Sequence, residues 1–88
     1  MILTGEVPLI SCINHDYVEI ACMYGFEIRL VLKNDQIVQG KAIQTAYNEN
    51  MEECVVLHMQ HGNEKIVLDQ LASMEAVTKN PHFDKINF

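Results

Sequence analysis

The sequence predicts a mainly β protein: a small five-stranded antiparallel barrel preceded by a short N-terminal α-helix. Three observations support this: a helical apolar stripe near the N-terminus, five short runs rich in strand-forming residues behind it, and turn residues between those runs. Short, bent antiparallel strands close readily into a barrel, which removes aggregation-prone sheet edges. A chain of 88 residues has room for one core, so we expect a single domain over residues 1–88.

The first regular element expected is a helix over residues 16–24. Its apolar stripe has the spacing i, i+3, i+4, i+7 of one helix face: Tyr17, Ile20, Ala21 and Tyr24. Asp16 and Glu19 have the spacing of a capping box, and Gly25 suits the left-handed conformation that ends a helix. Residues 1–11 lack periodicity and are expected to form an extended arm.

Five strands are expected within residues 26–78. Their approximate ranges are 26–33, 36–44, 52–60, 64–68 and 72–78. The first alternates apolar and other residues with period two, which is typical of a strand with one buried face. Gly40, in the middle of the second, indicates a bend or a bulge because glycine has no side chain to hold a flat strand.

Turn residues separate these strands. Asn34-Asp35 tolerates positive φ, residues 45–50 are polar and predict a loop, and His61-Gly62-Asn63 predicts a turn. Residues 69–71 are expected to form one helical turn. The tail, residues 79–88, is mostly polar and is expected to wrap loosely or fray.

The charge balance excludes one large class of function. Asp and Glu number 12 against six Lys and Arg, a formal net charge of −6. A protein that binds nucleic acid mainly through phosphates needs the opposite sign. Residues 1–28 contain four acids and no Lys or Arg, so the composition favours a basic partner, or none.

The cysteines and the apolar runs indicate a cytoplasmic protein. No run approaches the roughly 20 apolar residues that span a bilayer, and the N-terminus lacks the charged and apolar regions of a signal peptide. Cys12, Cys22 and Cys54 are odd in number and not closely spaced, which does not indicate a disulfide framework. Reduced thiols are the simplest interpretation.

Four segments together resemble a known family. Residues 28–40, an apolar strand, a polar turn and a strand with a central glycine, are similar to the first half of an Sm-like barrel. With residues 8–12, 16–22 and 66–71, they resemble the Rho-binding antiterminator family, small bacterial proteins that inhibit the transcription terminator Rho. The most specific part is the segment from Cys12 to Cys22. The resemblance spans roughly residues 8–78.

The resemblance implies an N-terminal helix on an Sm-like barrel and an activity that is not enzymatic. Such proteins bind the RNA-binding N-terminal region of the hexameric Rho helicase, keep RNA off it and so cause antitermination. The family's contact surface, carried by the helix and by loops between strands, maps here onto five residues: Asp16, Glu19, Asn48, Glu49 and Asn50. Ion pairs at the solvent-exposed edge of an interface contribute too little to hold a complex alone, so an apolar anchor is also needed. Tyr17 is a candidate for this anchor. We expect no direct nucleic-acid binding, no membrane contact and a monomer when free.

Three alternatives remain open at this stage, of which a metal-dependent or redox module built on the cysteines is the weakest. The barrel pattern also fits an Sm-like RNA-binding module, although the net charge opposes it. Asp16 and Glu19 could equally do no more than cap the helix, and Tyr17 could pack on the barrel.

No cofactor and no metal are expected. Cys12-x-x-His15 and His58-x-x-His61 have zinc-ligand types, but strand positions three apart point to opposite faces. Cys54 and His58 would lie about 13 Å apart on a strand, too far for a nucleophile and its base. We therefore expect no enzyme.

Overall fold

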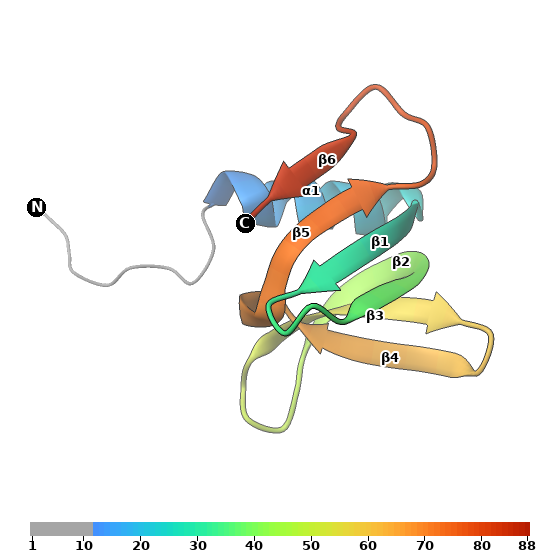
Figure 1. Ribbon diagram of the computed structural model, residues 1–88. Helices are drawn as coiled ribbons and strands as arrows, with labels where there is room; N and C mark the ends of the chain where they lie inside the picture. The colour runs from blue at the N-terminus through green and yellow to red at the C-terminus, as the bar shows by residue number, and fades with distance from the viewer. Residues whose placement is uncertain (1–11) are drawn as a thin grey trace, which may run out of the picture.

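The computed structural model describes residues 12–88, so the expected arm, residues 1–11, lies outside the described residues. Helix α1 (Cys12–Tyr24) is followed by a sheet whose strands are β1 (Glu27–Leu32), β2 (Ile37–Tyr47), β3 (Glu53–Met59), β4 (Gly62–Val67), β5 (Leu71–Ala76) and β6 (Lys85–Asn87), with a 3-10 turn η1 (Leu68–Gln70) before β5 (Figure 1). No helix in the described part is long and apolar enough to cross a membrane.

Helix α1 begins at Cys12, four residues before the predicted start. No acidic residue lies in its first turn, so the expectation that Asp16 and Glu19 form a capping box is wrong. Asn14, in the first turn, donates to the carbonyl oxygen of Asn87 at 3.3 Å, which connects the start of the helix to β6.

The predicted end of α1 is confirmed. Gly25 has a φ of 66°, in the left-handed region. The N–H of Gly25 donates to the carbonyl of Cys22 at 3.2 Å, and the N–H of Phe26 donates to that of Ala21 at 2.9 Å. This pair of bonds satisfies carbonyls that the helix end would leave free.

The six strands form one antiparallel sheet in the order β4-β3-β2-β1-β5-β6. The mainly β class and the N-terminal helix are confirmed, but the sheet is not closed into the predicted five-stranded barrel. The physical reason is β6, which occupies the free edge of β5 that closure would use, through the pairs Ser73–Asn87, Met74–Ile86 and Glu75–Lys85. The prediction that residues 79–88 fray is therefore wrong.

Strand β2 bends at a different residue from the one predicted. The register of β2 against β3 shifts between Ala42 and Gln44, so the bulge lies at Ile43. Gly40 instead allows close approach: a Cβ there would lie 2.9 Å from the carbonyl oxygen of His58. The strand also continues through residues 45–47, which pair with β3 and shorten the predicted loop.

The core lies between α1 and the sheet. Figure 1 shows α1 running across one face of the sheet, with β6 alongside it. Val18 and Ala21 are fully buried in one cluster with side chains of every strand region, including Ile28, Leu30, Leu57, Leu71 and Met74. A helix of 13 residues is marginal alone, so this burial stabilises it.

Candidate functional site

The exposed side of α1 carries two acidic residues, and the helix contains no Lys or Arg. Val18 and Ala21 face the core, which turns Asp16 and Glu19 toward solvent. The side chain of Glu19 is 53% exposed. We call Asp16 and Glu19 the acidic helix face. Helix α1 contains no Lys or Arg, so nothing on the helix itself neutralises this face other than protonation of a histidine.

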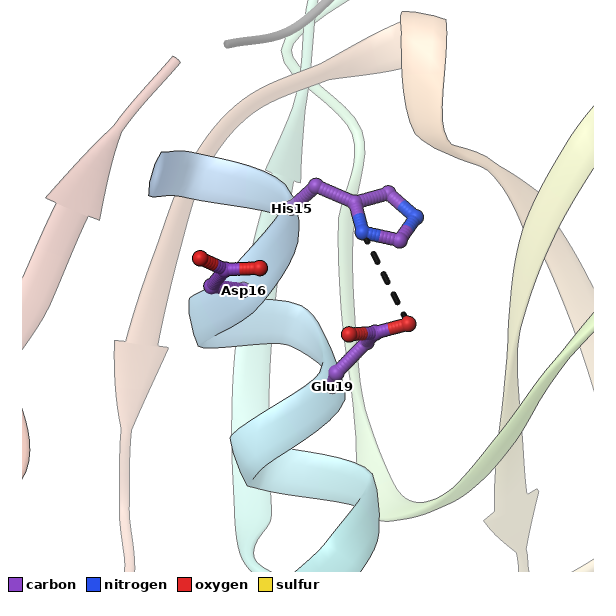
Figure 2. A group of neighbouring side chains, drawn as sticks. All are labelled: His15, Asp16 and Glu19. Carbon is purple, nitrogen blue, oxygen red and sulfur yellow. Dashed lines mark ion pairs between the residues drawn. The ribbon is translucent and has the colours of Figure 1, made fainter. Parts of the chain in front are cut away.

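That histidine, His15, lies between carboxylates of two elements. Its Nε2 is 2.8 Å from Oε2 of Glu53, the first residue of β3, and its Nδ1 is 3.8 Å from Oε2 of Glu19. Figure 2 shows Glu19 reaching back along the helix toward the His15 ring. The hydrogen bond to Glu53 raises the pKa of His15; partial burial opposes this, and the charges of Glu53, Glu19 and Asp16 reinforce it.

The second predicted contact region is the turn between β2 and β3, which projects from the sheet (Figure 1). We call residues 48–52 the acidic loop. Oδ1 of Asn48 accepts the N–H groups of Asn50 at 2.9 Å and of Glu52 at 3.0 Å, and its Nδ2 donates to Oε1 of Glu52 at 3.0 Å. The side chain of Asn48 is therefore occupied within the loop, whereas Glu49 and Asn50 are exposed.

The structure connects these two regions through one contact. Glu53 follows the acidic loop directly and holds His15, which lies one residue before Asp16. No local pattern in the sequence indicates this link, because the two residues are 38 positions apart. His15 and Glu53 are thus residues that sequence reasoning missed.

The predicted anchor Tyr17 is half-buried, and its ring packs against Phe83 with centroids 5.5 Å apart. Two other apolar side chains are more exposed: Tyr47, which directly precedes the acidic loop, at 60% and Met51, within the loop, at 75%. Met51 has a φ of 62°, so its outward position depends on the turn conformation, which no sequence pattern displays.

Three possible metal ligands lie close together on α1. Ligand atoms of His15, Asp16 and Glu19 are all within 4.8 Å of one another, the one such group among residues 12–88. The His15 ring is already engaged by Glu53, so the arrangement is a charge network, and we assign no ion to it. The two histidines of the β3–β4 hairpin that were considered as zinc ligands have other partners. The ring of His58 is hydrogen-bonded to Asn63 at 2.9 Å, and that of His61 lies 3.7 Å from Glu64.

The two cysteines whose side chains are described do not form a reactive centre. Burial raises the pKa of Cys22 to about 11 and also raises that of Cys54. The thiol of Cys54 donates to the carbonyl of Glu52 at 3.4 Å, while His58 is bonded to Asn63. Protonated thiols without a basic partner are poor nucleophiles.

Comparison with known proteins identifies a family and a similar solved structure. The family described as modulator of Rho-dependent transcription termination (ROF) matches residues 9–88. A solved structure described as YaeO bound to magnesium, from Vibrio cholerae O395, is 36% identical with a TM-score of 0.81. The alignment covers 83% of this chain and 95% of that chain. No curated protein matches the sequence.

Proposed function

This chain belongs to the family of modulators of Rho-dependent transcription termination, and from that premise we propose how it acts. It binds the RNA-binding N-terminal region of the Rho hexamer and competes with RNA through its acidic surface, which inhibits termination. We propose that it does so as a cytoplasmic, single-domain protein, monomeric when free and without catalysis, RNA binding or a cofactor.

The observation that carries the proposal is the acidic helix face. A surface that binds RNA must attract phosphates and is therefore basic. Helix α1 offers Asp16 and Glu19 with no Lys or Arg among its residues, and the acidic loop adds Glu49 and Glu52, both exposed. Attraction between an acidic surface and a basic one accelerates their association, most strongly at low salt.

Several of the basic side chains are engaged with acids elsewhere in the sheet. Arg29 lies 2.9 Å from Glu75 on the β1–β5 ladder, and Lys33 lies 3.6 Å from Asp69 in η1. These pairs neutralise charge locally on β1 and its neighbours. Among the described residues, Asp16 on α1 and Glu49 and Glu52 in the acidic loop form no such ion pair.

Affinity requires more than charge. An exposed ion pair contributes only about 0.2–1 kcal/mol, so apolar contacts must supply the rest. Tyr47 directly precedes the acidic loop and Met51 lies within it, and both expose most of their side chains. We propose that these two residues join the acidic helix face, with Tyr17, Glu49 and Asn50, in contacting Rho, while Asn48 holds the loop in shape.

The test is an RNA-competition assay with purified Rho across a salt series, read by the fluorescence anisotropy of a labelled single-stranded RNA. The protein should co-elute with Rho, displace the RNA, and lose potency as salt rises. The protein alone should leave the anisotropy of the RNA unchanged. Binding of RNA in the absence of Rho would instead identify an RNA-binding module, and failure to displace RNA at low salt would overturn the proposal.

A further inference from the structure

His15 stands where a proton can alter the acidic surface. The charged groups that act on its ring come from two elements: Glu53 from β3, and Asp16 and Glu19 from α1. Its side chain is 27% exposed and that of Glu53 is 30% exposed, so both remain in contact with water and can exchange protons with it. Each of the two ring nitrogens faces a carboxylate oxygen (Figure 2 shows the Glu19 side).

We propose that His15 is a proton-controlled positioning residue of the Rho-binding surface: its protonated ring holds Glu19 and Glu53 and masks the acidic helix face, and its neutral ring releases Glu19 to the partner. This inference rests on the proposed binding of Rho. It adds a regulation to that surface, namely inhibition that is stronger at neutral than at mildly acidic pH.

The geometry distinguishes the two protonation states. The imidazolium has an N–H on both nitrogens, so it donates to Glu53 at 2.8 Å and attracts Glu19 at 3.8 Å. The neutral ring has one N–H. If that N–H serves Glu53, a lone pair on Nδ1 faces the carboxylate of Glu19, and this contact becomes repulsive. Loss of the proton therefore frees Glu19 and restores one unit of negative charge.

Thermodynamic linkage makes the effect reciprocal. A basic partner that engages Glu19 competes with the imidazolium for the same carboxylate, so binding must lower the proton affinity of His15. Proton binding must weaken partner binding by the same factor. The hydrogen bond to Glu53 raises the pKa of His15, which moves the transition from its ordinary range toward neutral pH.

The chain offers a matched control in His61. Its Nε2 also faces a glutamate, Glu64 at 3.7 Å, but it lies in the β3–β4 hairpin. Strand β3 runs from Glu53 to Met59, about 20 Å at 3.3 Å per residue, and His61 lies in the turn beyond its far end. Replacement of either histidine by glutamine removes one titrating group. Only the replacement at position 15 removes it from the acidic surface.

The experiment measures displacement of labelled RNA from Rho between pH 6 and pH 8.5 for the full chain, His15→Gln and His61→Gln. At each pH, the affinity of each variant is divided by that of the unmodified chain, which cancels the contribution of groups that titrate in Rho itself. Relative to His15→Gln, the unmodified chain should gain about two- to fivefold in affinity as pH rises, the range of one exposed charge pair. His61→Gln should follow the unmodified chain. Parallel curves for all three would overturn the inference.

A second measurement needs no Rho. The NMR titration of the His15 ring should show a lower midpoint in Glu53→Gln than in the unmodified chain, with circular dichroism unchanged. An unchanged midpoint would show that the two residues are not coupled in solution and would also overturn the inference. If the coupling is present but no variant binds Rho at any pH, the proposed function itself fails, and the two failures are distinguishable.

Discussion

The ring of Phe83 packs edge-on against the ring of Tyr17, with centroids 5.5 Å apart and ring planes inclined at 66°. Phe83 is only 8% exposed and also contacts Phe26, at 6.2 Å between centroids. The segment between β5 and β6 thus reaches back to the helix residue that directly follows Asp16. The C-terminal part of the chain therefore helps to set the orientation of the acidic helix face.

Phe83→Ala should destabilise the fold substantially. Removing a nearly buried phenyl ring leaves a cavity beside Tyr17 and Phe26, and such changes cost about 3 kcal/mol or more. Urea denaturation followed by circular dichroism measures the loss. Phe88→Ala, at a half-buried position that follows β6, should cost clearly less. Equal stability of Phe83→Ala and the unmodified chain would show that the tail does not pack on α1 in solution.

Gly40→Ala should also destabilise, for a different reason. The new Cβ would lie 2.9 Å from both the His58 carbonyl oxygen and Cγ of Met59. Because one of these contacts is to backbone, β2 and β3 must separate, at a cost of about 1–3 kcal/mol. Gln44→Ala, an exposed position on the same strand, should stay within about 0.5 kcal/mol of the unmodified chain. The unfolding free energies of the two variants, measured side by side in urea, decide the point.

The sequence was sufficient for those parts of the fold that depend on local pattern. The helix end at Gly25 and the turn at Asp35, whose φ is 71°, follow from residues that tolerate the left-handed region. The alternation of apolar and other residues in β1 likewise predicts one buried face, and Ile28 and Leu30 on that face are fully buried.

The parts that failed depend on contacts distant in the chain. Strand β6 has three residues, too few to show a period of two, and it exists because β5 offers an edge. The helix begins before its predicted start, and Asn14 in its first turn bonds the Asn87 carbonyl, 73 positions away. The acidic residues of the candidate surface were predictable by type. Their connection through His15 and Glu53 was not, because nothing local to either residue indicates the other.

Asn48→Ala should loosen the acidic loop. The variant removes two accepted N–H bonds and one donated bond, leaving the Asn50 and Glu52 amides to water. We expect a loss of about 1–2 kcal/mol in stability together with faster amide exchange confined to residues 49–52. Asn50→Ala changes a neighbouring exposed side chain with no such role, so it should leave the exchange rates nearly unchanged. Identical exchange in both variants would contradict the role assigned to Asn48.

Stability should depend on pH through His15. The pKa of His15 is raised in the folded state, chiefly by the hydrogen bond to Glu53, so the folded protein binds the proton more tightly than the unfolded chain. The resulting stabilisation is fully present below the unfolded pKa of about 6.5 and disappears as pH rises through the folded pKa. The unfolding free energy of the unmodified chain minus that of His15→Gln should therefore fall by up to about 1 kcal/mol between pH 5.5 and pH 8.5. A difference in unfolding free energy that stays constant or rises with pH would contradict this prediction.

Charge reversal on the acidic helix face should weaken Rho binding without unfolding the protein. Asp16→Lys and Glu19→Lys each replace attraction to a basic surface by repulsion, and we expect about a tenfold loss of affinity, mostly in the association rate. Glu64→Lys is the matched control: it makes the same charge change in the β3–β4 hairpin. Glu75 is unsuitable, because its carboxylate holds Arg29 at 2.9 Å. Surface plasmon resonance at two salt concentrations gives the rates, and an equal loss in Glu64→Lys would mean that net charge alone, not this surface, determines binding.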